Sequence, residues 1–164
     1  MAPPGYLLAE VAGVVGDEAG LHHTVILVRK GEAGRGTVPE KALLITVGGM
    51  EGTAIAMAVA KKAYVRPLTH DLTSQILTRL ESRVRGLYIH SLQKETFFAR
   101  LELESRGDGP HSFDCRPSDG LALALRAEAP IWVDAKVFEK AALNLTGKGI
   151  PKPPAKPPEA ARSL

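Results

Sequence analysis

Two segments with the same design constrain the fold of this chain more than any other feature of its sequence. They are Arg66–Leu72, which reads RPLTHDL, and Asp114–Gly120, which reads DCRPSDG. In each, an Arg-Pro step stands just before an apolar pattern of helical spacing. Proline disfavours helix at the residue before it and suits the first turn of a helix. Each segment, here called an Arg-Pro corner, therefore predicts a strand or loop that turns sharply into a helix. Such a turn places a guanidinium and carboxylates beside the exposed N–H groups of a helix start, which favour anions.

Length and composition predict one globular domain with a separate tail. The chain has 164 residues and a formal net charge of +3, and residues 147–164 hold four basic residues against one acidic residue. The remaining 146 residues are formally neutral, so bulk charge gives little support for nucleic-acid binding. The same tail is rich in proline and lysine and poor in large apolar residues, which predicts disorder. We expect a domain over residues 1–146 and a disordered tail over 147–164.

The sequence also bears on location and redox chemistry. No apolar run reaches the roughly 18 to 20 residues that a membrane span needs, and the start lacks the pattern of a signal peptide. A cytoplasmic protein with no membrane segment is therefore expected. The single cysteine, Cys115, excludes an internal disulfide and a cysteine-based zinc cluster. We expect it to be a small buried residue.

Hydrophobic periodicity predicts an α+β domain with a mixed sheet, helices at the strand-helix corners and a β-hairpin in the second half. Strands and helices are both present without strict alternation, which disfavours a doubly wound sheet. The expected strands are Tyr6–Val15, Thr24–Lys30, Ala42–Val47, Val84–Leu92, Thr96–Glu104, His111–Arg116 and Ile131–Val133. The expected helices are Glu51–Lys62, Thr69–Glu81, Ser118–Ala127 and a last one that Asp134 caps and that ends near Leu143. The glycine-rich stretch 31–40 is expected to be a loop.

Four pieces of the chain, taken in order, resemble the bifunctional nuclease family of small bacterial and plant domains. They are the strand-glycine-helix joint Ile45–Ala56, the first Arg-Pro corner, the hairpin through Thr96–Ala99, and the segment Asp114–Arg126 followed by Ala129-Pro130-Ile131. The resemblance covers about Leu8 to Leu143. It implies nuclease activity on both RNA and DNA, and it does not identify the catalytic residues.

The chain departs from the usual family pattern in three places. The stretch Asp17–Lys41 is longer and richer in glycine than the usual pair of short strands. Gly52 stands where alanine is typical, and Cys115 and Gly120 stand where the second corner usually has alanines. The point differences exchange one small residue for another and leave the expected fold unchanged, whereas the longer stretch could alter access of the substrate.

Cleavage of a phosphodiester is open to two routes with the residues at these corners. With a metal, carboxylates would hold Mg²⁺ or Mn²⁺, which activates water; the candidate ligands are Glu51, Asp71, Asp114 and Asp119. Without a metal, His70 would act as general acid or base while Arg66 and Arg116 hold the phosphate. The metal route is favoured here, because acidic residues outnumber histidines at these joints. The candidate catalytic residues are His70, Asp71, Arg116, Asp119 and Glu51, and the candidate substrate-binding residues are Arg66, Thr69 and Ser118.

Each candidate also has a purely structural interpretation. Thr69, Asp71, Ser118 and Asp119 all suit the cap or first turn of a helix. The two arginines could pair with nearby carboxylates and pin the corners together. The adjacent His22 and His23 point to opposite faces of a strand, so they are not expected to share a metal ion.

We therefore expect a cytoplasmic nuclease of low sequence specificity, a hydrolase with RNase and DNase activity. The alternative is a non-catalytic module that binds an anion, a nucleic acid or a protein with the same corners. A third hypothesis is a structural salt-bridge system with function elsewhere. An exposed edge of the Thr96–Glu104 hairpin could pair two subunits into a homodimer.

Overall fold

The computed structural model describes residues 2–32 and 39–145. The predicted tail 147–164 and most of the predicted loop 31–40 lie outside the described residues. The strands are β1 (Tyr6–Gly16), β2 (His22–Arg29), β3 (Lys41–Gly48), β4 (Ser82–Gln93), β5 (Thr96–Ser105), β6 (Gly109–Cys115), β7 (Ile131–Asp134) and β8 (Leu143–Asn144). The helices are α1 (Gly49–Val59), α2 (Thr69–Arg79), α3 (Pro117–Arg126) and α4 (Ala135–Ala141).

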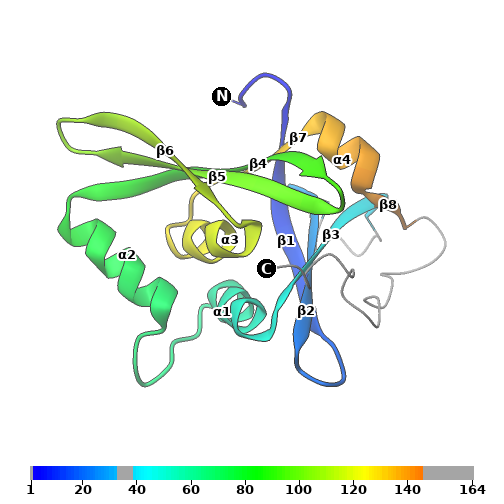
Figure 1. Cartoon of the computed structure of the whole chain (residues 1–164), viewed down its shortest axis with the longest axis horizontal. Helices are drawn as coiled ribbons and strands as arrows, with labels where there is room; N and C mark the ends of the chain where they lie inside the picture. Colours follow the sequence, from blue (N-terminus) through cyan, green and yellow to red (C-terminus); the bar gives the residue numbers. More distant parts are fainter. Residues whose placement is uncertain (1, 33–38, 146–164) are drawn as a thin grey trace.

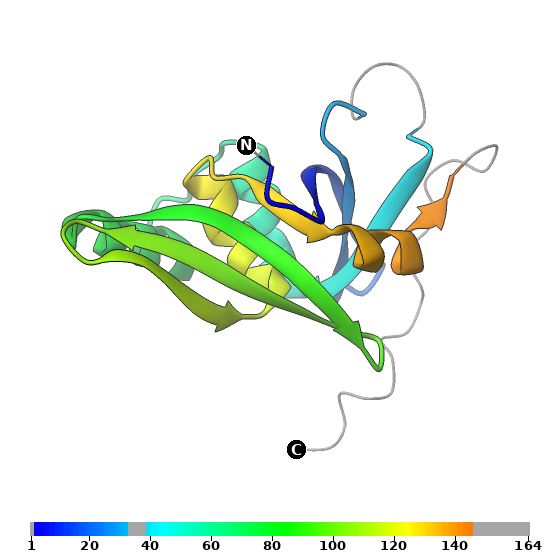
Figure 2. The same ribbon diagram turned by 90° about the horizontal axis from the view of Figure 1, so that it is seen from above.

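A single mixed sheet carries the fold, which confirms the predicted α+β class. The strand order is β6-β5-β4-β7-β1-β2-β3-β8, and among the strands within residues 2–32 and 39–145 only the β4–β7 pair is parallel. In Figure 1 the ribbon of β4, β5 and β6 runs across the direction of β1, β2 and β3. Figure 2 shows α1, α2 and α3 together on one side of that ribbon. The start of α1 directly follows the end of β3, and the start of α3 lies beside it because Arg116 contacts Glu51.

The core forms because apolar residues recur at the period of each element. In β5, Ala99 and Leu101 are buried and Phe97 and Leu103 pack against the same cluster, as the alternation of that strand predicts. On the helix side, α3 buries Leu121, Ala122 and Ala124 against the sheet. The last predicted cap is confirmed, since Asp134 Oδ1 accepts hydrogen bonds from the backbone N–H groups of Lys136 and Val137 at the start of α4.

The sheet edge differs from the sequence expectation. β5 is not an edge strand, because β4 pairs with one side of it and β6 pairs with the other side from Ala99 to Ser105. The prediction of a free edge on Thr96–Glu104 was therefore wrong, and β6 forms that end of the sheet. The sequence could not reveal this, because the length of β6 and its pairing depend on a contact between separate segments.

Helix α2 has no buried residue, whereas α1, α3 and α4 each bury apolar residues. Leu72, Ile76 and Leu80 follow one another at helical spacing, and 53%, 49% and 67% of their surfaces are exposed. Phe113 on β6 is also exposed. Leu72 and Ile76 of α2 together with Leu80, the residue at its C-cap, are here called the α2 stripe.

The departure at Gly52 has a packing reason. A Cβ at this position would lie 2.3 Å from both Cβ and Cγ of His23, which reaches from β2 toward α1. We expect Gly52→Ala to lower the free energy of unfolding by about 1–3 kcal/mol, because these atoms lie near the His23 backbone and cannot rotate away. Thermal unfolding by circular dichroism measures the change. Addition of His23→Gly, which removes both atoms, should restore part of the loss, whereas His23→Ala keeps Cβ and should restore less. An unchanged melting temperature in Gly52→Ala would contradict the packing argument.

Candidate active site

The second Arg-Pro corner lies where β6 ends and α3 begins. Arg116 is the N-cap residue in extended conformation and Pro117 is the first helical residue, as the sequence predicts. Among the described residues, no side chain caps this helix start, so first-turn N–H groups such as that of Ser118 lack a side-chain acceptor. Ser118 itself is buried.

Arg116 joins two carboxylates from different elements. Its Nε and Nη2 donate hydrogen bonds to Asp119 Oδ2 and Oδ1 at 2.7 and 2.9 Å, and its Nη1 donates to Glu51 Oε1 at 3.1 Å. These contacts use three of the five guanidinium N–H groups. Two donors remain without a partner among the described residues, on a side chain that is 65% exposed. Arg116 is thus oriented by the protein and still open to an incoming anion.

The glycine before α1 makes room for Glu51. A Cβ on Gly48 would lie 2.5 Å from Glu51 Oε2, so the carboxylate occupies the space that any larger residue would fill. Glu51 belongs to the first turn of α1, where the helix dipole favours a negative charge. The strand-glycine-helix joint therefore positions the carboxylate that contacts Arg116.

His70 reaches the same cluster from the first Arg-Pro corner. Its Nε2 lies 3.4 Å from Asp119 Oδ1, and its side chain is 13% exposed. Burial raises the pKa of the Asp119 carboxyl, but the hydrogen bonds from Arg116 and His70 outweigh this and hold it below its usual range. Asp119 is consequently a carboxylate at neutral pH, held between a histidine and an arginine.

Asp71 lies outside this cluster, and its hydrogen bonds hold helices together rather than facing the cleft. Its Oδ2 accepts the backbone N–H of Leu68 at 2.8 Å, and its Oδ1 accepts Arg126 Nε at 2.6 Å. Arg126 also donates to the carbonyl oxygens of Ala54 and Ala122. The hydrogen bond from Arg126 and then that from Leu68 lower the pKa of the Asp71 carboxyl. Asp71 thus fastens the start of α2 to the end of α3.

The other sequence candidates lie outside the Arg116 cluster. Arg66 and Thr69 are exposed, and Arg66 makes no ion pair with the residues that the structure describes. Asp114 is exposed on the edge strand β6, opposite Arg100. Cys115 is half-buried, and burial together with Asp119 and Asp114 raises the pKa of its thiol to about 11. It therefore stays protonated at neutral pH and is a poor nucleophile.

The four carboxylates that could have held Mg²⁺ or Mn²⁺ do not converge. Glu51 and Asp119 both contact Arg116, Asp71 is paired with Arg126, and Asp114 is on β6. Within residues 2–32 and 39–145, no group of three or more His, Cys, Asp or Glu side chains is arranged to hold a metal ion. A guanidinium stands between the two nearest carboxylates, so this donor set does not fit a divalent cation.

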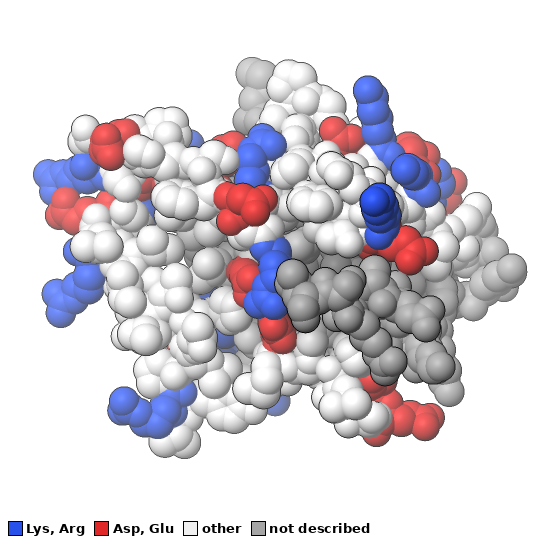
Figure 3. Space-filling model, in the orientation of Figure 1, with Lys and Arg blue, Asp and Glu red and all other residues white. Residues whose placement is uncertain are grey.

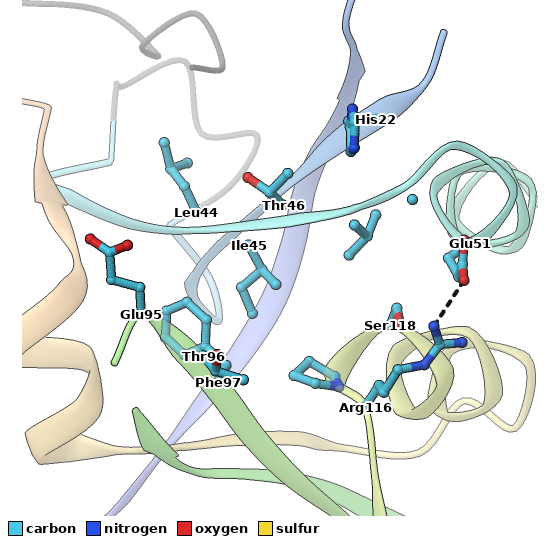
Figure 4. Close-up of a pocket in the computed structure, with 13 residues that line it drawn as sticks. His22, Leu44, Ile45, Thr46, Glu51, Glu95, Thr96, Phe97, Arg116 and Ser118 are labelled. Carbon is cyan, nitrogen blue, oxygen red and sulfur yellow. Dashed lines mark hydrogen bonds and ion pairs between the residues drawn. The ribbon is translucent and has the colours of Figure 1, made fainter. Parts of the chain in front are cut away.

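A cleft of about 570 Å³ opens beside Arg116. Figure 4 shows Arg116 and Glu51 at one end of this cleft and Glu95 and Phe97 at the other. Its wall is made by the end of β3, the tip of the β4–β5 hairpin and the starts of α1 and α3. The lining residues are His22, Leu44, Ile45, Thr46, Val47, Gly48, Glu51, Glu95, Thr96, Phe97, Arg116, Pro117 and Ser118.

Sequence reasoning missed His22 as a site candidate. This histidine lines the cleft and pairs across the strands with Gly48, over which the Glu51 carboxylate lies. Its Nδ1 is 3.3 Å from Asp17 Oδ2. An aspartate five residues before a histidine, across a tight turn, was the available signal. His70 and Asp119 lie behind Arg116 and do not line the cleft.

Acid should weaken the ion pair between Asp71 and Arg126 and so lower the stability of the protein. Because the folded-state pKa of this carboxyl lies below its ordinary value of 3.8, its contribution to stability is present above that value and is lost as the pH falls through the folded pKa. We expect the free energy of unfolding to fall more steeply from about pH 5 to about pH 2 in the wild type than in Asp71→Asn. Urea titrations at each pH measure it, and parallel curves for the two proteins would refute this role of Asp71.

Positive and negative side chains are mixed on one face of the molecule. On the face in Figure 3, Lys and Arg alternate with Asp and Glu outside the grey residues. Recognition of an anion on this face would therefore depend on individual contacts such as those of Arg116 rather than on a broad positive field.

Comparison with known proteins agrees with this arrangement. The model of the bifunctional nuclease domain matches residues 35–146. The chain belongs to the bifunctional nuclease domain family. The match includes both Arg-Pro corners, Glu51 and the β4–β5 hairpin, so the residues that line the cleft belong to the matched region, except His22 of β2, which precedes it.

Relatives of this bifunctional nuclease domain occur in bacteria and plants. An uncharacterized protein of Mycobacterium tuberculosis H37Rv is 36% identical over 104 residues, which are 63% of this chain and 61% of that protein. Bifunctional nuclease 2 of Arabidopsis thaliana is 30% identical over 115 residues, 69% of this chain and 33% of the plant protein. Bifunctional nuclease 2 of Oryza sativa subsp. japonica is 29% identical over 96 residues, 57% of this chain and 30% of that protein. The chain thus matches less than two thirds of the length of each of these relatives.

Proposed function

We propose that this protein is a nuclease that hydrolyses phosphodiester bonds of RNA and DNA with low sequence specificity in the cleft beside Arg116. The observation that carries the proposal is the state of Arg116, which two carboxylates orient while two of its N–H donors stay available at the cleft. Family membership and the names of the plant relatives support the nuclease class.

The phosphate would bind at Arg116 and the start of α3. The two available guanidinium N–H groups suit two phosphoryl oxygens, and the uncapped start of α3 adds backbone donors. A phosphate that displaces Glu51 from Arg116 would leave the Glu51 carboxylate free beside the scissile bond. Binding of the phosphate would then release Glu51, so that its carboxylate can act as a base.

The cleft residues offer an acid and a base for hydrolysis without a metal. Glu51 would accept a proton from the attacking water as the new P–O bond forms. His22, held at Nδ1 by Asp17, would give a proton from Nε2 to the oxygen that leaves as the old P–O bond breaks. His70 would act as a positioning residue, because it holds Asp119 and through it the plane of the Arg116 guanidinium.

A non-catalytic anion-binding module is the second candidate. The observation in its favour is that Arg116 stands against two carboxylates, Glu51 and Asp119, which weakens attraction for a phosphate. Such a module would bind an oligonucleotide or an acidic partner at the same cleft and leave it intact.

Cleavage assays with the purified full chain separate these candidates. Labelled single- and double-stranded RNA and DNA are incubated with the protein in EDTA, Mg²⁺ or Mn²⁺. The proposal expects cleavage of both RNA and DNA that persists in EDTA. Loss of all cleavage in EDTA would replace the acid-base route by the metal route, and an absence of cleavage under every condition would leave the binding module.

We also propose a cytoplasmic homodimer that forms through the α2 stripe. Within the described residues no helix is long and apolar enough to cross a membrane. Three large apolar side chains on one exposed helix face suit a self-complementary contact. Light scattering should give the mass of a dimer for the wild type and of a monomer for Ile76→Glu. A monomeric wild type at high concentration would exclude this contact.

A further inference from the structure

The end of the cleft opposite Arg116 is built by an unusual hairpin turn. Gln93 pairs with Thr96, so the turn between β4 and β5 holds only Lys94 and Glu95. Both have positive φ, 44° and 66°, and neither is glycine or asparagine, the residues that such a turn favours. Backbone strain of this kind is costly and is concentrated at functional sites of proteins.

The strained turn carries a carboxylate to the cleft. Glu95 lines it together with Thr96 and Phe97, and Figure 4 shows the Glu95 carboxylate and the Phe97 ring on the same side of the cavity. No ion pair or hydrogen bond joins Glu95 to the other residues that the structure describes. Leu44 and Ile45 of β3 supply an apolar wall. This end therefore combines a flat aromatic surface, an apolar wall and one acceptor group.

We infer that the cleft holds one nucleotide of the substrate, with its phosphate at Arg116 and a guanine base against Phe97 with its edge at Glu95. This inference rests on the proposed function and adds a base preference to it. Phe97 is half-buried because it also packs against the core, and the part of its ring that lines the cleft offers an apolar surface to a base. The choice of base comes from Glu95, because a carboxylate only accepts hydrogen bonds. Guanine presents two adjacent donors on one edge, N1–H and the N2 amino group, which match the two carboxylate oxygens.

The size and polarity of the cleft agree with one nucleotide. Its volume of about 570 Å³ lies within the range of small-molecule sites. A guanidinium with available donors stands at one end and a carboxylate at the other, which is the order of charges that a phosphate followed by a donor-rich base requires. Adenine and cytosine have one amino group beside an acceptor, so the carboxylate would face that acceptor.

Calorimetric titration of the full chain with 5′-GMP, AMP, CMP and UMP tests the inference without any need for cleavage. We expect GMP to bind at least tenfold more tightly than the other nucleotides, and Glu95→Gln to remove this preference. Glu95→Gly serves as a second variant, because it relieves the strained turn and should melt at or above the wild-type temperature while it loses the preference. Glu81→Gln, which changes an exposed carboxylate at the end of α2, is the matched control and should bind GMP as the wild type does.

The outcomes also separate this inference from the proposed function. Equal affinity for the four nucleotides, or an unchanged preference in Glu95→Gln, would overturn the guanine subsite even if the protein cleaves RNA and DNA. A preference for GMP that depends on Glu95, in a protein that cleaves nothing, would support the subsite and count against the nuclease.

Discussion

Replacement of Arg116 by alanine should lower the rate of phosphodiester cleavage by two to three orders of magnitude, on the order of the loss that follows removal of one preorganised donor from a transition state. The physical reason is that this side chain has two roles. It donates to Asp119 and Glu51, and it keeps two donors for the phosphate. Alanine removes the phosphate contact and also leaves the two carboxylates facing each other without a counter-charge.

Lysine should restore little of this activity. An ammonium group is a point charge and cannot donate in parallel to both oxygens of Asp119 while it also serves a phosphate. Arg79→Ala is the control, since this arginine lies in the last turn of α2 and is exposed. Rates under single-turnover conditions compare the variants. An Arg116→Ala protein of verified fold that cleaves at the wild-type rate would place the chemistry elsewhere.

The largest expected effect on stability is that of Arg126→Ala. This side chain is 11% exposed and donates to Asp71 Oδ1 and to the carbonyl oxygens of Ala54 and Ala122. Alanine would remove the donor to Asp71 Oδ1 and the additional donor to the Ala54 carbonyl at the junction of α1, α2 and α3. We expect the free energy of unfolding to fall by about 2–4 kcal/mol, with the partial exposure of Asp71 holding the loss below that of a fully buried pair.

Denaturant titration measures the loss, and a second variant identifies its origin. Asp71→Asn keeps the hydrogen bonds to the Ala54 and Ala122 carbonyls, so it should cost less than Arg126→Ala. The double variant Asp71→Leu with Arg126→Met removes both charges together and should recover part of the loss. An Arg126→Ala protein as stable as the wild type would show that this junction is held by apolar packing alone.

Local sequence rules anticipated the strands β1 to β7, the four helices and the two corners, but not β8, whose first residue was expected at the end of the last helix. Proline in the first turn placed the start of α3, and the β5 alternation placed Ala99 and Leu101 inside. The same rules could not give partners across the chain. Nothing local distinguishes Asp71, which pairs with Arg126, from Asp119, which pairs with Arg116 and His70. The pairing depends on how α1, α2 and α3 meet.

Contacts between residues far apart in the sequence explain the departures from the family pattern. Gly52 is small because His23 fills the space beside it. Gly120 is small because its Cβ would lie 2.3 Å from Leu87 Cδ1 and 3.1 Å from Cys115 Sγ, so the larger residue at 115 and the smaller one at 120 belong together. His22 was considered only as a metal ligand and not as a cleft residue, because its neighbour at the cleft, Gly48, belongs to another strand.

The most direct test of the central claim is to map the residues that a nucleic-acid strand contacts. The full chain, labelled with ¹⁵N, is titrated with a short oligonucleotide whose phosphorothioate linkages resist cleavage. Our account predicts that the largest amide shifts fall at Glu51, Phe97 and Ser118 and that they vanish in Arg116→Ala. Shifts that spare the cleft and follow the α2 stripe or β6 instead would contradict it.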